Sequence, residues 1–396
     1  MNRESGTVIL GGARTPFGKL NGGLASLSAV QLGAVALRET IVRAGIDPAA
    51  IGHVVLGQAI QAGAGQNPAR QVSAAVGLDR AVTSETINHV CGSGIRAVAL
   101  ADMAIRLGDH QVVVAGGMES MTQAPYLLRG ARGGYRMGDG VLEDAMMADG
   151  LWCALDSCAM GAHGDRVAGE ERVSREEQDA WALRSHTLAL EAIDSGWMAR
   201  QIAPVEVAGR KASVTVTEDE APRRDTSAEA LARLRPAFTP DGSVTAGNAP
   251  GVNDGAAALI VAGAEWASAN GVTPRARILA HAQAAWDAPY LAYTPAMAAE
   301  KALQKAGLVV SDVDLFEINE AFASVTLISA RRLGIDLDRV NVHGGAIALG
   351  HPLAASGGRI LLSLVQELED RGGGIGVAAI CTGGGQGDAI AIEVGG

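Results

Sequence analysis

The sequence predicts an α/β fold built from two related halves, with a loop-rich insertion in the first half. Short apolar strands alternate with helical stretches up to residue 121 and again from about residue 274. This alternation favours a largely parallel sheet covered by helices on both faces. Residues 122–250 break the pattern with Gly-rich loops and amphipathic helices. The predicted division is a first half at 1–121 and 251–273, an inserted domain at 122–250, and a second half at 274–396.

The elements of the first half follow from short apolar runs bounded by turn residues. The expected strands are "TVILGG", "HVVLGQA", "TSETIN" and "QVVVAGG". Two helices are expected near 28–44 and 67–76. A third helix starts at Cys91 and is apolar nearly all round, which predicts that it is buried in the middle of the protein. "GAAALIVAG" then returns the chain to the sheet.

A weak internal repeat supports the two halves. "INHVCGSGIRAVALADMAIRLGDHQVVVAGG" can be laid beside "INEAFASVTLISARRLGIDLDRVNVHGG". Each runs from Ile-Asn through a helix into a Val-rich strand that ends in Gly-Gly. Such self-similarity is typical of a duplicated unit; the alternative is chance similarity.

Composition excludes several classes of protein. The 396 residues, 48% of them hydrophobic, can bury a large core. A net charge of −11 without a basic tract argues against a nucleic-acid binder. The sequence shows no signal-peptide stretch and no apolar run of membrane-spanning length, so a cytoplasmic protein without a membrane partner is expected. Four cysteines in such a chain are not a disulfide framework.

Cys91 is a candidate nucleophile because it lies where a helix is expected to begin. Unpaired backbone N–H groups and the helix dipole would favour its thiolate. Gly92 and Gly94 allow a sharp turn and a close approach by a substrate. The competing interpretation is a small core cysteine at a tight turn, and the residues around Cys91 taken alone favour it.

Three polar side chains in the second half stand among small residues and reverse that preference. Asn319 lies in "NEAF", His351 in "NVHGGAIALGHPLAASGGR", and Cys381 precedes three glycines in "CTGGGQG". A nucleophilic thiol, a base, a second thiol and oxyanion donors together indicate acyl transfer through a thioester.

With these residues the chain resembles the thiolase family, the acetyl-CoA acetyltransferases and 3-ketoacyl-CoA thiolases, over essentially its full length. The stretches that carry the resemblance are "GGARTPFGK", "NHVCGSG", "GGMESM", "LRPAF", "VTAGNAPGVNDGAA", "NEAFA", "GGAIALGHP" and "CTGGGQGDA". The resemblance implies a five-layered α-β-α-β-α fold and reversible Claisen condensation or thiolytic cleavage of CoA thioesters. It looks closest to the bacterial acetyl-CoA acetyltransferase branch.

The resemblance also assigns roles to the candidate catalytic residues. Cys91 would carry the acyl group, and His351 would be the base that activates it. Cys381 would move the proton on the substrate α-carbon or on the CoA thiol. Asn319, through a bound water, and His351 would stabilise the enolate. The backbone N–H groups of Cys91 and Gly383 would form a second oxyanion hole for the tetrahedral intermediate.

The insertion corresponds to the loop domain that holds CoA in the family. By this match Met160 would line the acyl pocket, and Arg223 with Arg224 would lie near the CoA nucleotide; the alternative is a solvated surface pair. Further substrate contacts are expected at Ala246, Pro250, Ala321 and Phe322. The expected partners are acyl-CoA and CoA as substrates, with no resident cofactor and no metal. The resemblance implies a homodimer or homotetramer, with "RGARGGYRMGDG" as an exposed association loop.

Several positions depart from the family pattern. Cys158 and Ala159 stand where the family commonly has tyrosine and histidine, and Pro250 replaces a serine of the pantetheine loop. "AHGDR" stands where Thr-Ala-Glu-Asn is common. These changes lie on the CoA and acyl side, so they suggest a pocket for acyl groups longer or more branched than acetyl. His343 replaces an asparagine and either replaces its hydrogen bond, as we favour, or titrates beside His351.

Three other interpretations deserve comparison. Cys153, Cys158 and His163 could be zinc ligands, but the spacing is loose and no fourth ligand stands out, so no metal is predicted. A ketoacyl-synthase-type condensing enzyme pairs one cysteine with two histidines, which His343 and His351 could supply; the second thiol at 381 argues against it. A thiolase-like acyl-CoA carrier without catalysis is the third.

Overall fold

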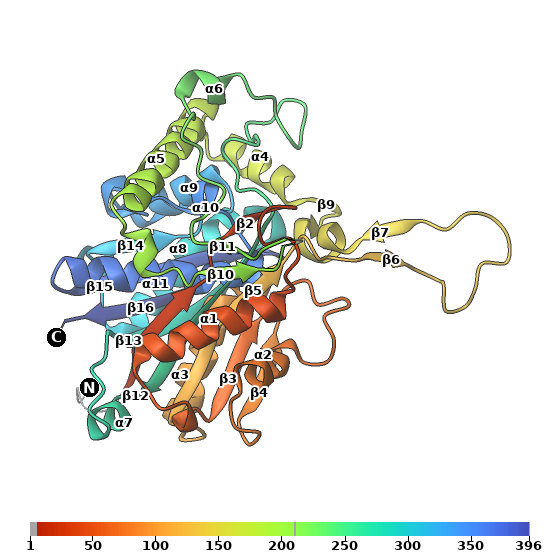
Figure 1. Ribbon diagram of the computed structural model, residues 1–396. Coiled ribbons are helices and arrows are strands. Elements are labelled where there is room, and N and C mark those ends of the chain that lie inside the picture. The colour runs from red at the N-terminus through yellow and green to blue at the C-terminus, as the bar shows by residue number, and fades with distance from the viewer. Residues whose placement is uncertain (1–5, 210, 396) are drawn as a thin grey trace.

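The structure, a computed structural model, describes residues 6–209 and 211–395. Within that part of the chain its centre is one mixed sheet of ten strands (Figure 1). The spatial order is β14 (Leu315–Ile318), β15 (Gly374–Thr382), β16 (Gln386–Val394), β13 (Ala276–Ala285), β1 (Thr7–Arg14), β12 (Asn253–Gly263), β5 (Val112–Ser120), β3 (His53–Gly57) and β4 (Thr83–Ile87), and β2 (Gly18–Lys19) pairs with β12.

The expectation of a largely parallel sheet is wrong. Strand β3 runs parallel to β4 and β5, and β14 runs parallel to β15, but the other neighbouring strands are antiparallel. The last two strands show the reason most clearly. Strands β15 and β16 are joined by the glycines at 383–385, and so short a connection can only make an antiparallel hairpin.

The expected local elements of the first half are present. Helix α1 (Ala29–Ala44) begins at a capping box formed by Ser28 and Gln31 and ends at Gly45 with a φ of 63°. Helix α2 (Pro68–Val76) follows, and then α3 (Ser93–Leu107). None of the helices in the described ranges has both the length and the apolar character that crossing a membrane requires.

The sheet is continuous through a pairing of three residues each in β1 and β13, but its two halves form separate β layers on either side of one inner core. The layers therefore run α-β-α-β-α, as the family resemblance implies. Helices α3 and α11 (Ser356–Asp370) share one buried core with strands of both halves. On the outer faces, α1 and α2 cover the first half, while α8 (Thr294–Ala306) and α9 (Ala323–Leu333) cover the second (Figure 1). Side chains alternate accordingly: Val8 and Leu10 face the outer core and Ile9 faces the inner one.

The two halves repeat the same topology. The first half has the strand order β1-β12-β5-β3-β4, and the second has β13-β16-β15-β14 followed by an isolated parallel bridge from Phe316 to Val340. Helix α3 therefore corresponds to α11, and α2 to α9. The repeat drawn from the sequence, which paired the Cys91 helix with 318–345, was one strand out of register. Its Ile-Asn and Gly-Gly signals are too short to fix a position in a sheet.

The two central helices touch where they begin. A Cβ on Gly94 would lie 2.7 Å from the backbone nitrogen of Gly358, and one on Gly357 would lie 2.4 Å from the backbone nitrogen of Ile95. Only glycine permits this approach of two backbones. The contact joins the first turn of α3 to the first turn of α11.

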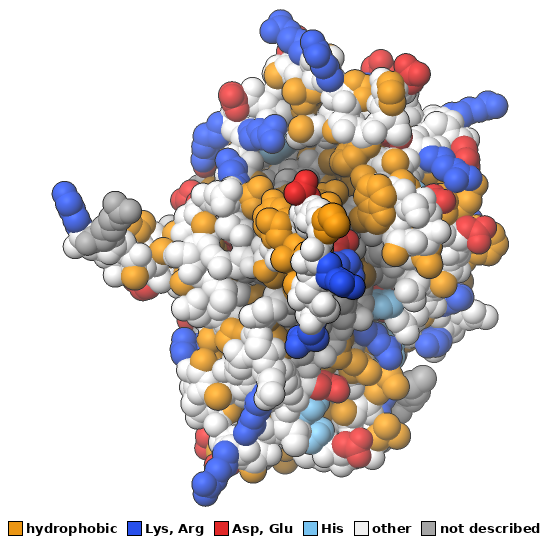
Figure 2. Space-filling model, turned by 90° about the vertical axis from the view of Figure 1, so that its right-hand side faces the viewer, with side chains coloured by type: hydrophobic (Ala, Val, Ile, Leu, Met, Phe, Trp, Pro, Cys, Tyr) orange, Lys and Arg blue, Asp and Glu red, His pale blue; other side chains and the backbone are white. Residues whose placement is uncertain are grey.

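Within the described residues, 122–250 add no strand to the main sheet. They form α4 (Met160–Glu170), α5 (Arg175–Asp194), α6 (Ala228–Ala232) and three small ladders: β6 (Tyr126–Leu128) with β7 (Leu142–Asp144), β8 (Trp152–Cys153) with β9 (Cys158–Ala159), and β10 (Val205–Val207) with β11 (Val214–Val216). The remaining α-helices are α7 (Ala264–Ala269) and α10 (Ala346–Leu349). The β6–β7 hairpin projects away from the body (Figure 1). In Figure 2 this hairpin points towards the viewer, and apolar side chains gather around it.

Candidate active site

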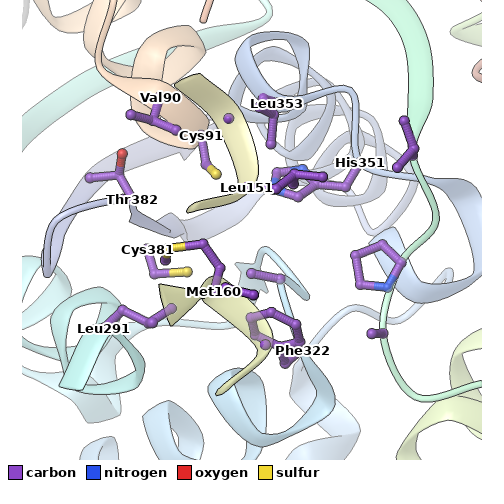
Figure 3. A pocket seen from close by; sticks show the side chains of 18 of the residues that line it. Val90, Cys91, Leu151, Met160, Leu291, Phe322, His351, Leu353, Cys381 and Thr382 are labelled. Carbon is purple, nitrogen blue, oxygen red and sulfur yellow. The ribbon is translucent and has the colours of Figure 1, made fainter. Parts of the chain in front are cut away.

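A cavity of about 200 Å³ lies where the two halves meet the loop-rich segment. Three of the predicted catalytic side chains line it, namely Cys91, His351 and Cys381, together with the backbone of Gly383 (Figure 3). Its other walls are mainly apolar: Val90, Met121, Met147, Leu151, Ala159, Met160, Phe238, Pro250, Val252, Leu291, Ala321, Phe322 and Leu353 all contribute.

Cys91 sits in a 3₁₀ turn, Val90–Gly92, and α3 itself begins at Ser93. The helix was expected to start at the cysteine, but the 3₁₀ turn precedes it and the helix begins at Ser93. Val90 has a φ of 45°, a left-handed conformation that costs a β-branched residue free energy. The turn is held by the hydroxyl of Ser93, which accepts from the N–H of His89 and donates to the carbonyl of Val90.

The Cys91 thiol is protonated at neutral pH, contrary to the expectation from the helix terminus. Burial, followed by the charge of Glu119, raises its pKa to about 12. The backbone N–H groups of Cys91 and Gly383 act in the other direction and lower the pKa, as donors directed at the sulfur should. Desolvation exceeds their contribution.

His351 is buried and neutral. Burial, followed by the charge of Arg359, lowers its pKa to about 3. Its Nδ1 lies 2.6 Å from the Ser356 hydroxyl, which donates to the carbonyl of Pro352. Nδ1 therefore carries the proton, and Nε2, which has no protein partner among the described residues, keeps a free lone pair.

A backbone hydrogen bond fixes the loop that presents His351. Its N–H donates to the Asn253 side chain at 2.9 Å. The preceding Gly350 has a φ of 103°, and a Cβ there would lie 2.7 Å from the Asn253 amide. Glycine is required at this position for both reasons.

Cys381 is the next-to-last residue of strand β15 and faces the same cavity as Cys91 (Figure 3). Burial raises its pKa well above that of an ordinary thiol, and the neighbouring Cys91 raises it further. Two protonated thiols and one unprotonated imidazole nitrogen therefore face a single apolar space. All three groups are uncharged in the resting site, and protons can pass between them during a reaction.

Asn319 follows strand β14 directly, is fully buried and is not among the residues that line the cavity. Its Oδ1 accepts from the Arg359 guanidinium at 3.4 Å, and Arg359 pairs with Glu317 at 3.2 Å. The Asn319 Nδ2 has no hydrogen-bond partner within the described ranges. A buried amide held by its oxygen leaves its nitrogen as a donor for a bound water or ligand.

The predicted substrate contacts divide into two groups. Met160, Pro250, Ala321 and Phe322 line the cavity, whereas Ala246 is exposed and outside it. Arg223 and Arg224 line a separate surface depression with Leu183, His186, Thr187, Leu190, Glu191, Asp194 and Thr226.

Arg223 and Arg224, the two candidate CoA contacts, share this depression but have different hydrogen-bond partners. The N–H of Arg223 donates to Nδ1 of His186, and the Arg224 guanidinium forms a two-bond ion pair with Asp194. Burial and the charge of Arg223 lower the pKa of His186 to about 4.

His343 lies outside this depression: it stacks on Trp197 and contacts Glu367. His343 is not among the residues that line the cavity with Cys91 and His351, so it is not placed there as a second histidine.

Glu119 is the buried group that the sequence did not reveal. Its carboxylate accepts from the N–H groups of Ala59, Ile60 and Ala354, and burial raises its pKa to about 7. These hydrogen bonds join the loop after β3 to the turn before α11. "GGMES" contained the residue, but nothing local marked it as buried.

Comparisons with known proteins agree with this geometry. The family model described as thiolase, N-terminal domain, matches residues 7–265, and that described as thiolase, C-terminal domain, matches residues 272–394. The chain is 49% identical over 387 residues to the acetyl-CoA acetyltransferase of Escherichia coli (strain K12), and 46% identical to that of Thiocystis violacea, with 98% of each chain covered in both cases. A crystal structure of the Bacillus anthracis acetyl-CoA acetyltransferase matches with a TM-score of 0.96 at 42% identity, over 98% of this chain and 99% of the other. The chain therefore belongs to the thiolase family.

Proposed function

We propose that the protein is an acetyl-CoA acetyltransferase that moves acyl groups reversibly between CoA thioesters through an acyl-Cys91 intermediate. The convergence of Cys91, His351 and Cys381 on one apolar cavity, from three distant segments, supports this most directly. Similarity to acetyl-CoA acetyltransferases along the whole chain supports the same reaction class.

In the first half-reaction the Cys91 sulfur attacks the thioester carbonyl of one acyl-CoA. Its proton passes to the free Nε2 of His351 as the C–S bond forms. The N–H groups of Cys91 and Gly383 stabilise the tetrahedral oxyanion. The bond to CoA then breaks, and the departing CoA sulfur takes the proton of Cys381, which becomes a thiolate.

In the second half-reaction the Cys381 thiolate removes a proton from the α-carbon of acetyl-CoA. The protonated His351 and a water held by Asn319 stabilise the enolate oxygen. The enolate carbon attacks the acyl group, and the Cys91 sulfur departs with the proton returned by His351. Every group thus regains its resting protonation state, and no metal or redox step is needed for this balance.

The apolar walls support substrates longer than acetoacetyl-CoA. Met147, Leu151 and Leu291 line the cavity together with the small Ala159, so an acyl chain can extend beyond the two carbons of acetyl. The kcat/KM for acetoacetyl-CoA should be equalled or exceeded by that for 3-ketoacyl-CoAs with longer chains. A clear preference for acetoacetyl-CoA would contradict the extended pocket without affecting the reaction class.

Arg223 and Arg224 are proposed to bind the CoA nucleotide, because an acidic protein needs local cations to hold phosphates. We also propose a homodimer or homotetramer in the cytoplasm, with residues 122–250 acting as the CoA-binding domain. The exposed β6–β7 hairpin supports the larger assembly.

Thiolysis of acetoacetyl-CoA by CoA tests the reaction. The wild-type protein should produce acetyl-CoA with ping-pong kinetics, and Cys91→Ala should lower kcat by roughly 10³-fold or more. Cys153→Ser is the matched control, because that thiol does not line the cavity. A non-catalytic carrier would bind acyl-CoA without turnover in any variant.

A further inference from the structure

We propose that Asp156, Cys158 and His163 form a binding site for one divalent transition-metal ion of the zinc type. The three ligand atoms lie within 4.8 Å of one another, and they are the cluster with this property in the described part of the chain. The site is separate from the catalytic cavity described above. Its ligands come from the loop-rich segment alone.

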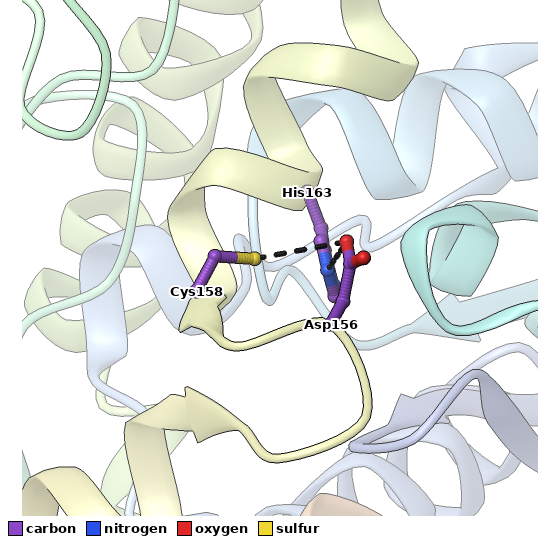
Figure 4. A group of neighbouring side chains, drawn as sticks. All are labelled: Asp156, Cys158 and His163. Atoms are coloured by element: carbon purple, nitrogen blue, oxygen red, sulfur yellow. Dashed lines mark hydrogen bonds and ion pairs between the residues drawn. The ribbon is translucent and has the colours of Figure 1, made fainter.

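Two of the three separations between the ligand atoms are close to those of a metal site (Figure 4). The His163 Nε2 lies 3.0 Å from the Asp156 Oδ2, and the Cys158 Sγ lies 3.9 Å from the same oxygen. Zinc bond lengths of about 2.0–2.3 Å in a tetrahedron correspond to edges of roughly 3.3 Å between nitrogen and oxygen and roughly 3.5 Å between sulfur and oxygen. Both observed separations are within about half an ångström of these edges.

The backbone fixes two of the ligands before any ion arrives. Asp156 and Cys158 flank Ser157, whose φ of 51° closes the tight turn between β8 and β9. His163 is on the first turn of α4, which begins directly after β9. A short loop and a helix start therefore supply all three ligands, with few free torsions left to order on binding.

Two of the proposed ligands differ in solvent exposure: His163 is buried, whereas Asp156 is exposed. The His163 side chain is 1% exposed and that of Asp156 is 43% exposed. The Nδ1 of His163 has no hydrogen-bond partner among the described residues, while its Nε2 is directed at the cluster. An ion can thus enter from the Asp156 side, and the fourth position stays open to water.

The ligand chemistry selects the ion. One sulfur, one imidazole nitrogen and one carboxylate oxygen suit zinc and exclude calcium or magnesium, which prefer oxygen ligands. The site differs from the Cys153, Cys158 and His163 set considered from the sequence. Asp156 occupies the place given to Cys153, because the β8–β9 turn folds the aspartate towards His163.

A bound ion would tie the β8–β9 hairpin to the start of α4. Ala159, Met160 and Gly161 lie in this stretch and line the catalytic cavity. The metal would therefore stabilise one wall of the acyl pocket without touching the reacting atoms. We expect zinc to raise the thermal denaturation midpoint, because a ligand that binds only the folded state stabilises it.

Titration of the purified, metal-free protein with Co²⁺, followed by Zn²⁺ displacement, tests the site. Co²⁺ bound to one thiolate should give a thiolate-to-metal charge-transfer absorption that saturates at one ion per chain. Cys158→Ser should abolish this absorption, and Asp156→Asn should weaken Co²⁺ affinity by about tenfold or more. Both substitutions are at accessible positions, and thermal denaturation checks that each variant folds.

Cys153→Ser and Cys91→Ala serve as controls, because each removes a thiol outside the proposed ligand set. Both should keep the absorption band and its stoichiometry. Absence of binding, or a band that survives Cys158→Ser and disappears in either control, would overturn the assignment. Activity is not the readout, so this result is independent of the proposed catalytic function.

Discussion

Cys91 and His351 meet in the cavity as a neutral thiol and a neutral imidazole. Burial sets both states, because it raises the pKa of the thiol to about 12 and lowers that of the imidazole to about 3. The resting enzyme therefore does not hold a thiolate–imidazolium ion pair. In the proposed mechanism, the proton of Cys91 therefore passes to His351 as the sulfur attacks the thioester.

The pH dependence of Cys91 alkylation checks this resting state. Because the raised pKa keeps the thiol protonated, the thiolate fraction grows about tenfold per pH unit throughout the neutral range. Inactivation by iodoacetamide should accordingly keep accelerating from about pH 7 to above about pH 9. A plateau below about pH 8 would instead indicate a preformed thiolate. Peptide mass spectrometry identifies the alkylated cysteine.

Asn319 offers a second prediction at this scale. Asn319→Ala removes a buried donor proposed to act only on the enolate, so kcat should fall by roughly 10²–10³-fold while KM changes little. Steady-state kinetics give the split. A raised KM with unchanged kcat would assign Asn319 to ground-state binding, and thermal denaturation shows whether Arg359 tolerates the lost acceptor.

The candidate catalytic residues stand out in the sequence because each lies in a short motif of small residues. The family resemblance then joined Cys91, His351 and Cys381, and the structure places all three on one cavity. Glu119 was not predictable, because its role depends on backbone N–H groups from two distant loops. The protonation state of Cys91 was also missed: a helix start is visible in sequence, but the depth of burial is not.

Among the elements, the β6–β7 hairpin is the most exposed. Apolar side chains project from it, Met137 being 94% and Val141 80% exposed, which is unusual for a segment without a partner. Replacing residues 129–140 by a short Gly-Ser turn should reduce a tetramer to a dimer, as measured by analytical ultracentrifugation. The same mass for both proteins would contradict a role in assembly.

A buried ion pair ties β1 to the loop-rich segment. Arg14 donates two hydrogen bonds to Asp219, at 2.6 and 2.8 Å, and neither side chain is exposed. Arg14→Leu should lower the free energy of unfolding by about 3–5 kcal/mol, because it leaves a buried carboxylate without its partner. Urea denaturation measures the change.

Arg331→Ala is the control for this experiment, since it breaks an exposed pair with Glu177. Exposed pairs contribute little to stability, so the denaturation midpoint should scarcely move. Equal effects of the two substitutions would mean that burial does not decide the strength of the Arg14 pair.

At the scale of the whole molecule, the duplicated α/β architecture follows from the sequence, but its register does not. Periodicity and apolar runs identify the strands and helices. The direction of β12 and β16 depends on pairings between distant strands, so the sequence predicted too parallel a sheet. The corrected correspondence sets the turns of Cys91 and His351 in equivalent places before α3 and α11. Duplication thus brings Cys91, the proposed nucleophile, and His351, the proposed base, to one cavity.

The most direct test of the proposed mechanism is to identify the residue that carries the acyl group. The protein is mixed with acetyl-CoA, quenched in acid and digested, and the peptides are weighed by mass spectrometry. The proposed mechanism predicts one acetyl group on the peptide that contains Cys91, which is lost when CoA is added later and is absent from Cys91→Ala. An acetyl group on Cys381 instead, or none on any cysteine of an active preparation, would contradict it.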